Sequence, residues 1–387
     1  MLTAPTAPSP PTGTRRRTAS LRAALPALAA YAAARALGVL LVAAWGARRG
    51  TPGLHRLAAM WDAYWYQGIV VHGYAGFPPV PGPHGPYEAY AFFPAYPALI
   101  RLVHLCGVPV GAAALAVAWL ASLAAAWGIF RVGEHLYGRR VGVIAAVLWG
   151  VTPYALVESA AYSEPLFTAF VAWALYAAVR RDWLGAGVLA LLAGLSRPTG
   201  IALAAAVSGA ALWELLRGRA GWRAAAGMLL APLGFLGYLG WVGLVKGRWD
   251  GYFRVQDAWQ SHFDFGRKTF YSLRDLLVRP DAIMLADVVV AVVLAASVLL
   301  FALSIVQRQP LVLVLFSGAM LLLALGDAAY FNSRARFLLP AFTLLLPVAT
   351  GLARVRSRAS LVLILCSAAL ASALYGGYLA FVYPDAP

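Results

Sequence analysis

The sequence predicts an all-α polytopic membrane protein, and two observations carry that prediction. Of its 387 residues, 62% are hydrophobic and only 12% are charged, a composition too apolar for a soluble globular domain. Apolar runs also recur along nearly the whole chain, and many reach the roughly 20 residues that a helix needs to cross a bilayer. A β-barrel is excluded, because its strands would alternate apolar and polar residues with a period of two.

The net charge of +16 does not indicate a nucleic-acid partner. The arginines cluster in short segments between apolar runs, which is the pattern that membrane topology and anionic lipid headgroups favour. Cys106 and Cys366 both lie in apolar surroundings and have no metal-ligand spacing, so we expect two buried, unpaired thiols.

Residues 1–20 hold Pro, Thr, Ser and three consecutive arginines without apolar periodicity, which predicts a disordered cytoplasmic tail before one membrane domain over 21–387. Two large outer loops are expected at 47–108 and 246–281. Within the first, the short segment 92–106 has Pro near its start, and we interpret it as an interfacial or re-entrant helix. About eleven spans are expected, at 23–46, 109–130, 141–157, 163–179, 183–196, 199–216, 224–245, 282–306, 311–330, 337–352 and 360–382.

The short basic loops predict the orientation of the chain. With the N-terminus in the cytoplasm, the Arg-rich segments 131–140, 217–223 and 354–358 all fall on the inner side. The same count places every polar motif on the outer side, although the outer loops also carry many Arg and Lys residues.

The hexapeptide from Trp61 to Tyr66 places Asp62 among four rings, those of Trp61, Tyr64, Trp65 and Tyr66. Asp62 precedes a plausible helix, so its carboxylate could cap that helix. It could equally be a catalytic carboxylate with sugar-stacking rings around it. The residues alone leave both interpretations open.

Two further motifs interrupt apolar regions. Ser196-Arg197-Pro198-Thr199 could be a tight outer turn, or could hold a guanidinium for a phosphate, and the cost of an isolated Arg in so apolar a region favours an anion. Tyr162-Ser163-Glu164 could cap the following helix, and Glu164 could also form a structural ion pair with Arg197 across the outer surface.

Later segments add weaker candidates. The loop 246–281 mixes aromatic and basic residues around Gln256 and Trp259, which could bind sugar, phosphate or headgroups, or could form an interfacial helix. Arg334 and Arg336 place two cations on the outer side, where the positive-inside trend disfavours them, so a phosphate-binding role is attractive. The histidines are scattered, and no metal site is expected.

The first loop resembles the signature of the PIG-V-like mannosyltransferases, whose eukaryotic members are the GPI mannosyltransferase II enzymes. The segments that carry this resemblance are Trp61-Asp62-Ala63, Ile69 to Tyr74 with His72, and Ala91 to Pro97. Tyr162 to Glu164 and Ser196 to Gly200 resemble two later family motifs in the same order and spacing. Gln256 to Trp259 and Arg336-Phe337 fit more loosely, so the resemblance covers about residues 60–350.

The resemblance implies a bacterial member of the GT-C glycosyltransferases, a bundle whose large first outer loop contains interfacial helices. It implies inverting transfer of mannose from polyprenyl- or dolichyl-phosphate mannose, with Asp62 as general base. Arg197, Arg334 and Arg336 are the candidates for the donor phosphate. Candidates for sugar, lipid or acceptor contacts are Trp61, Tyr64, Trp65, Tyr66, His72, Tyr162, Glu164, Gln256 and Trp259. Ala63 stands where protein mannosyltransferases often have a second acid, so the metal requirement stays open.

We therefore expect an enzyme of the bacterial plasma membrane with its active site on the extracytoplasmic face and no cofactor. Its partners would be membrane lipids, the lipid-phosphate donor and an acceptor that is a glycolipid, a glycan or a protein. A lipid-linked sugar transporter or flippase is the main alternative. It would need charged residues near span centres, where Arg35 is the main example. A non-catalytic lipid-sugar binding subunit is the other alternative.

Overall fold

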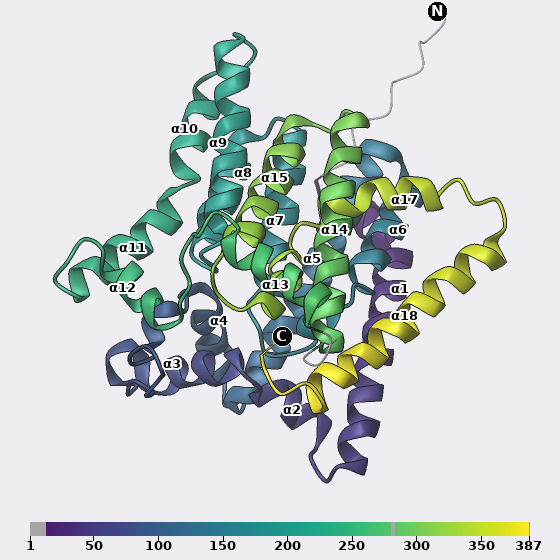
Figure 1. Ribbon diagram of the computed structural model, residues 1–387. Coiled ribbons are helices and arrows are strands. Elements are labelled where there is room, and N and C mark those ends of the chain that lie inside the picture. Colours follow the sequence, from purple (N-terminus) through teal and green to yellow (C-terminus); the bar gives the residue numbers. More distant parts are fainter. Residues whose placement is uncertain (1–12, 280–282, 387) are drawn as a thin grey trace, which may run out of the picture.

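The computed structural model describes residues 13–279 and 283–386, and Figure 1 shows them as a bundle of helices. These residues form no strand. They contain only two isolated β-bridges, between Val80 and Tyr87 and between Phe263 and Asp327. The second bridge joins the loop after α12 to the turn that follows α15, so the second outer loop is fastened to the bundle.

Among the described residues, twelve helices form the body of the molecule, and six further helices lie in the loops. The body consists of α1 (Gly13–Arg48), α5 (Val110–Tyr137), α6 (Arg139–Trp149), α7 (Glu164–Val179), α8 (Trp183–Gly194), α9 (Gly200–Leu216), α10 (Trp222–Leu230), α11 (Leu233–Val245), α14 (Leu285–Val306), α15 (Leu311–Gly326), α17 (Leu346–Leu352) and α18 (Arg358–Phe381). The loops contain α2 (Gly53–Ala59), α3 (Asp62–Gly76), α4 (Ala95–His104), α12 (Gly251–Ala258), α13 (Arg267–Val278) and α16 (Arg334–Phe337).

Several of these helices are long and apolar enough to cross a membrane. By length and composition they are 21–48 of α1, α5, the α10–α11 pair, α14 and α18, and a further candidate is the pair Phe331–Phe337 and Phe342–Leu352, bent by 75°. Shorter apolar helices are α7, α8, α9 and α15. All but the segment Phe331–Phe337, which falls mainly between two predicted spans, lie where the hydropathy predicted spans. The number of eleven spans stays a prediction.

Some boundaries differ from the predicted ones for local reasons. α1 begins at Gly13, so residues 13–20 are helical rather than part of a disordered tail, and residues 1–12 lie outside the described residues. The predicted span 141–157 ends as an α-helix at Trp149, before Pro153, and the chain continues in the 3-10 helix Ala155–Glu158. Proline lacks the N–H that a continuous helix needs, which explains this break. Cys106 and Cys366 are exposed, contrary to our expectation.

Helix packing in the bundle depends on close backbone approaches. α5 packs against α1, α4, α6 and α7, and its buried face is rich in alanine. α10 crosses α8 so closely that a Cβ atom on Gly227 would lie 2.2 Å from the Trp183 carbonyl oxygen. Membrane helices associate through small residues of this kind, because apolar side chains gain nothing from leaving lipid.

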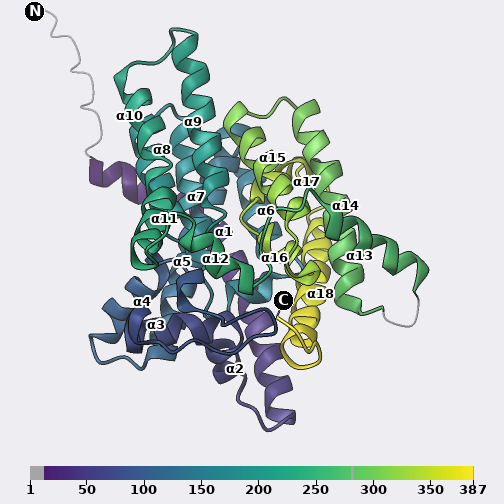
Figure 2. The same cartoon turned by 60° about the vertical axis from the view of Figure 1, so that its left-hand side comes forward.

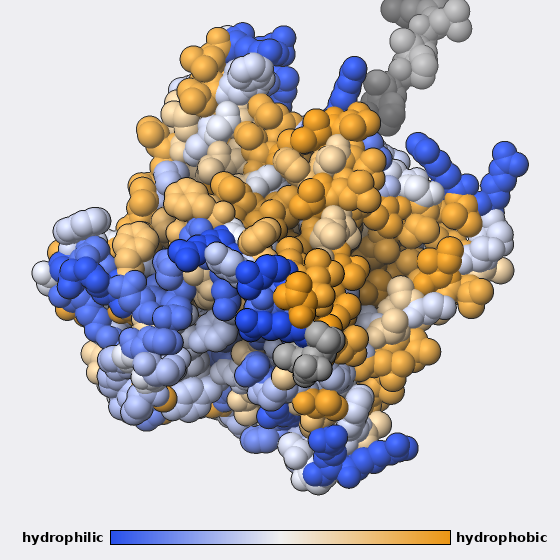
Figure 3. Space-filling view, viewed as in Figure 1, coloured by the Kyte–Doolittle hydropathy of each residue, from blue (hydrophilic) through white to orange (hydrophobic). Residues whose placement is uncertain are grey.

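The helices of the two large loops gather at one end of the bundle. α2, α3, α4 and α12 surround this end in both views (Figures 1 and 2). Figure 3 shows hydrophilic residues concentrated over this part of the molecule, and hydrophobic residues over the bundle beside it. The first loop therefore does contain helices outside the long apolar ones, and they lie where the motif-bearing turns emerge.

The close crossing of α8 and α10 allows the effect of a substitution on stability to be predicted. We expect Gly227→Ala to lower the free energy of unfolding by about 1–3 kcal/mol, because the added methyl group must push the α8 backbone away. Gly237→Ala on α11 is the matched control, since a Cβ atom there meets nothing within 4 Å. It should be neutral or slightly stabilising. Thermal unfolding of both variants in the same detergent would measure the difference, and equal melting temperatures would contradict the packing.

Candidate active site

Four charged side chains from distant parts of the chain meet at the motif-bearing end of the bundle. The Arg336 guanidinium donates to Asp62 Oδ2 at 3.0 Å and lies 3.3 Å from Glu164 Oε1. Arg197 lies 2.7 Å from Glu164 Oε2. The order of contacts is thus Asp62, Arg336, Glu164, Arg197, which we call the ion-pair chain. The predicted pair between Glu164 and Arg197 is present.

Two hydroxyl groups extend the ion-pair chain. Arg197 donates to Ser163 Oγ at 3.0 Å, and Ser163 Oγ lies 2.7 Å from the Tyr66 hydroxyl. Burial raises the pKa of Tyr66 above its ordinary value, so this hydroxyl stays protonated and serves as a neutral hydrogen-bonding group. Ser163, held by Tyr66, therefore binds the same guanidinium nitrogen of Arg197 that contacts Glu164.

Local backbone structure positions the two acids. Asp62 is the first residue of α3, and Glu164 is the first residue of α7. Negative charge is favourable at a helix N-terminus, where N–H groups are unpaired and the helix dipole is positive. The residue in the capping position is Trp61, not Asp62, so the helix-cap interpretation of Asp62 does not hold.

Trp61 has an unusual backbone conformation just before Asp62. Its φ is 47° and its ψ is −111°, backbone angles that residues other than glycine rarely adopt. Strain of this kind persists only where the surrounding structure enforces it, and it concentrates at functional sites. The Arg56 guanidinium lies over the Trp61 ring at 5.3 Å and also donates to the Ala380 carbonyl, which holds this turn against the end of α18.

The side chains of the ion-pair chain are largely buried, so little water screens the attraction between their charges. The Glu164 side chain is 1% exposed, Arg197 is 9% exposed, Arg336 is 8% exposed and Asp62 is 18% exposed. Two carboxylates face two guanidinium groups, so the formal charges cancel. Both contacts of Glu164 are ion pairs by distance and lack the geometry of well-directed hydrogen bonds.

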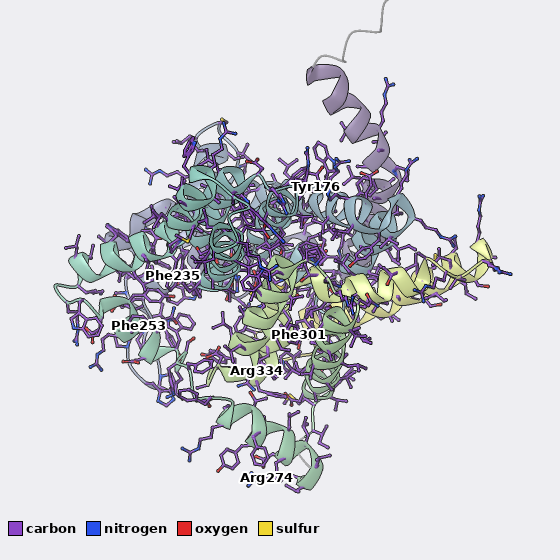
Figure 4. The ribbon with its side chains drawn as sticks, turned by 90° about the horizontal axis from the view of Figure 1, so that it is seen from above. Tyr176, Phe235, Phe253, Arg274, Phe301 and Arg334 are labelled. Carbon is purple, nitrogen blue, oxygen red and sulfur yellow. The ribbon has the colours of Figure 1, made fainter. Side chains whose placement is uncertain are left out.

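A cavity of about 500 Å³ opens beside the ion-pair chain. Among the residues that the sequence singled out, Asp62, Tyr66, Arg197, Gln256, Trp259 and Arg336 line it. The remaining wall is mostly apolar and includes Phe235 of α11, Phe253 of α12 and Met320 and Leu323 of α15. Figure 4 shows Phe235 and Phe253 on neighbouring helices near one edge of the molecule. The cavity thus combines a charged end with a long apolar side.

Seven candidates from the sequence do not line this cavity: Trp61, Tyr64, Trp65, His72, Tyr162, Glu164 and Arg334. Trp65 is buried behind the cavity wall, where its ring stacks on Phe92 at 5.5 Å. Tyr64 is 51% exposed, and His72 is exposed and stacks on Phe77. Tyr162 is buried beneath the Arg336 guanidinium, 5.3 Å from it.

Arg334 occupies a different environment from Arg336. It is fully buried, donates to the Asp327 carbonyl and lies over the Phe331 ring at 5.2 Å. Two residues of a short helix point in different directions, so only one of this pair can reach the cavity. Their spacing in the sequence is compatible with either one doing so.

A second cavity of about 790 Å³ adjoins the first and shares Trp259, Ala329 and Tyr330 with it. Its lining is more polar and includes His84, Lys268, Ser272 and Asp275. Burial raises the pKa of Tyr330 to about 12, with Tyr87 and Asp62 adding smaller contributions in the same direction. A neutral Tyr330 hydroxyl therefore lies between the two cavities. No group of three or more His, Cys, Asp or Glu side chains suited to a metal lies among the described residues.

Residues 88–241 match the family model of dolichyl-phosphate-mannose-protein mannosyltransferases, and no curated protein matches the chain. The matched segment contains Glu164 and Arg197 but neither Asp62 nor Arg336. Among solved structures, ArnT from Cupriavidus metallidurans bound to undecaprenyl phosphate is similar with a TM-score of 0.54, 14% identity and coverage of 97% of this chain and 67% of ArnT.

Archaeoglobus fulgidus oligosaccharyltransferase is also similar. Its apo form has a TM-score of 0.51 at 13% identity, with 93% of this chain and 58% of that chain covered. The form with an inhibitory peptide and a dolichol-phosphate, named AglB, has a TM-score of 0.52 at 13% identity, covering 93% of this chain and 56% of AglB. The chain therefore spans little more than half the length of these archaeal proteins.

At such identities the likeness shows the fold. The chain has the all-helical membrane fold of ArnT and AglB, and its apolar helices make it an integral membrane protein, as the sequence predicted. The narrower resemblance to the PIG-V-like enzymes stays a prediction.

The burial of the ion-pair chain predicts how the loss of one of its charges changes the stability of the protein. Arg336→Met should lower the free energy of unfolding by about 3–5 kcal/mol, because Asp62 and Glu164 lose a shared cation in a buried site. Arg254→Met is the control, since Arg254 is 61% exposed and its surface ion pairs are worth less than about 1 kcal/mol. Adding Glu164→Gln to Arg336→Met should recover part of the loss. Thermal unfolding would test this, and an unchanged melting temperature for Arg336→Met would refute it.

Proposed function

We propose that the chain is a glycosyltransferase that moves mannose from a polyprenyl-phosphate donor to an acceptor hydroxyl, with inversion. The observation that carries the proposal is one cavity that holds a carboxylate, two guanidinium groups and an apolar wall. These are the groups needed to activate an alcohol, to bind a phosphate and to accommodate a lipid. The family model over residues 88–241 and the solved structures with undecaprenyl phosphate and dolichol-phosphate support the same reaction class.

In the proposed reaction, Asp62 acts as the general base. The acceptor oxygen attacks the anomeric carbon of the donor while its bond to the phosphate oxygen breaks, and the lipid phosphate leaves with the electron pair. Asp62 takes the proton from the acceptor hydroxyl. One carboxylate oxygen of Asp62 is held by Arg336 at 3.0 Å, which orients the other toward the acceptor. A carboxylate is a weak base, so it acts mainly as charge develops on the attacking oxygen.

Arg197 and Arg336 are the proposed ligands of the donor phosphate. Both line the cavity, and each guanidinium has five N–H donors, so binding to Glu164 leaves donors for phosphate oxygens. Glu164 lies between the two guanidinium groups and fixes their separation before the donor binds. Cations placed in advance stabilise a departing phosphate without reorganisation during the reaction. The buried position of Arg334 favours a different role, that of holding the turn between α15 and α16.

The apolar wall is the proposed place of the lipid chain. Phe235 belongs to α11, Phe253 to α12, and Met320 and Leu323 to α15, and α11 and α15 are apolar helices of the bundle. A polyprenyl chain can therefore reach the cavity from the bilayer. The second, more polar cavity is the proposed entrance for the acceptor, past Trp259 and Tyr330.

We infer that this site faces outward from a bacterial plasma membrane and that the N-terminus is cytoplasmic. The support is that the ion-pair chain and the Arg-rich segments lie at opposite ends of the bundle. α1, α6 and α8 run toward the end that holds the ion-pair chain, whereas the Arg-rich segments 131–140, 217–223 and 354–358 lie at the other ends of these and neighbouring helices. Cytoplasmic loops carry such an excess of Arg.

A transporter or flippase is the second candidate function, and the position of Arg35 argues against it. Arg35, the main charge within a span, donates to Ser159 Oγ at 3.1 Å and to the Gly150 carbonyl at 2.7 Å in the packed bundle. The two cavities lie beside the loop helices instead. Purified protein that releases free polyprenyl phosphate from a labelled donor is a transferase, whereas a transporter or a non-catalytic binding subunit releases none.

The role of Asp62 predicts a specific loss of activity. Asp62→Asn should lower the rate of mannose transfer by about 10²–10⁴, because the acceptor proton loses its base. Asp257→Asn is the matched control, since Asp257 lines the same cavity but is 54% exposed and belongs to a surface ion pair. It should transfer mannose at nearly the original rate. Release of polyprenyl phosphate from radiolabelled donor measures both, and full activity of a well-folded Asp62→Asn protein would exclude this mechanism.

The role of Arg197 predicts an effect on donor binding. Arg197→Ala should raise the donor KM about 10- to 100-fold, because a charge-assisted hydrogen bond contributes about 1.5–3 kcal/mol. Arg197→Lys keeps the charge without the fork geometry and should recover part of this loss. Donor titrations at saturating acceptor measure the change. A donor dependence that does not change in folded Arg197→Ala would assign Arg197 to structure alone.

A further inference from the structure

α13 differs from the apolar helices around it because little of its surface packs against the protein. Thr269 is its one buried residue among those described, and its hydroxyl donates to the Leu325 carbonyl near the end of α15. Leu273 and Leu276 are partly buried against the core on the same face. Since α15 ends at Gly326 and α14 begins at Leu285, α13 lies at the level where both apolar helices end. In a membrane this is the level of the lipid headgroups.

The outward face of α13 is apolar. Phe270 is 65% exposed and Leu277 is 86% exposed, and their spacing of seven residues places both side chains on one face of the helix. Val278 and Phe265 add further exposed apolar surface at either end. Figures 2 and 4 place α13 at the periphery of the bundle, with Arg274 marking it in Figure 4.

Cations flank this apolar face. Residues 267–279 contain Arg267, Lys268, Arg274 and Arg279 and a single acid, Asp275, which lies 3.0 Å from Arg274 and 3.8 Å from Arg279. The segment therefore carries a net positive charge beside exposed rings. Figure 3 shows hydrophilic residues next to hydrophobic ones where α13 lies. An amphipathic helix of this composition binds in the plane of an anionic membrane surface.

We propose that α13 is a lipid-binding helix, which inserts Phe270 and Leu277 among the acyl chains and binds anionic headgroups through Arg267 and Arg274. The occupant of this surface is the membrane leaflet itself, because α13 packs against the apolar helix α14, whose own exposed residues include Leu285 and Val292. The inference does not depend on whether the chain transfers a sugar.

The same helix forms part of the wall of the second cavity. The α13 residues that line it are Arg267, Lys268, Tyr271, Ser272, Asp275 and Leu276, whereas Phe270, Arg274 and Leu277 do not line it. Arg267 therefore lies at the edge between the cavity face and the face that carries Phe270 and Leu277. α13 thus separates lipid on one side from a polar space on the other. Binding of anionic lipid to α13 consequently stabilises one wall of the second cavity.

Site-specific fluorescence can test this proposal in the full-length protein. In a background with Cys106→Ser and Cys366→Ser, a single cysteine at Leu277 is labelled with an environment-sensitive fluorophore and the protein is reconstituted into phosphatidylcholine vesicles. Ser272→Cys on the cavity face of the same helix is the matched control. Nitroxide-labelled lipids quench a fluorophore only where they contact it. We expect strong quenching at position 277 and much weaker quenching at position 272.

The headgroup preference is measured at the same position. Nitroxide-labelled phosphatidylglycerol should quench position 277 more than nitroxide-labelled phosphatidylcholine at the same proportion. Arg267→Gln with Arg274→Gln should reduce this preference by up to about fivefold for each charge removed. Arg267→Lys with Arg274→Lys keeps the charges and should retain it, which separates an electrostatic effect from misfolding.

Three results would overturn the proposal. One is equal quenching at positions 277 and 272, and another is equal quenching of position 277 by the two lipids. The third is blue-shifted fluorescence at position 277 without lipid quenching, because another protein surface would then cover this face.

Discussion

The ion-pair chain of Asp62, Arg336, Glu164 and Arg197 is the constraint on which the rest of the site depends. Burying a single charge costs several kcal/mol, and the cost is offset only when an opposite charge is held in good geometry. Here two acids and two arginines are buried together, so none of them can be placed independently. The first loop, the start of α7, the turn after α8 and the short α16 must therefore reach the same point.

Other local features help to hold these four segments together. Both acids begin a helix, where the dipole favours their charge, and the strained turn at Trp61 is tied to α18 through Arg56. The backbone N–H of Ala95 donates to the Leu195 carbonyl, which joins the start of α4 to the turn that carries Arg197. Because its formal charges cancel, the ion-pair chain is stable in an apolar environment without a ligand. It still contains the two guanidinium groups that are the proposed ligands of the donor phosphate.

The sequence predicted most of the fold and only part of the site, and the difference has a physical cause. Hydropathy located the spans because a bilayer requires long apolar helices, and counting them brought Asp62, Glu164 and Arg197 to one side. It also indicated the pair of Glu164 with Arg197. It could not predict that Asp62 contacts Arg336, 274 positions away, because Arg336 lies in the bent pair Phe331–Phe337 and Phe342–Leu352, whose shape hydropathy does not reveal.

The sequence also could not predict in which direction each side chain points. The four rings around Asp62 looked equivalent in sequence, yet only Tyr66 lines the cavity, because successive residues of α3 point in different directions. Phe235 was not among the predicted site residues, and Phe253 was recognised only as part of the aromatic and basic loop 246–281. In a chain this rich in aromatic residues, nothing in the sequence distinguishes a ring that faces a cavity from one that faces lipid.

The pairing of Asp62 with Arg336 has a consequence for the proposed reaction. A lipid-phosphate sugar is a phosphodiester with one negative charge, whereas the released lipid phosphate is a monoester with a charge of about −1.5 to −2 at neutral pH. The site must therefore stabilise additional negative charge on the phosphate as the sugar leaves. In the proposed reaction, Asp62 loses its own charge as it takes the acceptor proton, and this releases Arg336 from its ion pair with Asp62. The proton transfer and the growing phosphate charge thus favour each other through one guanidinium, while the total charge of the buried site stays nearly constant.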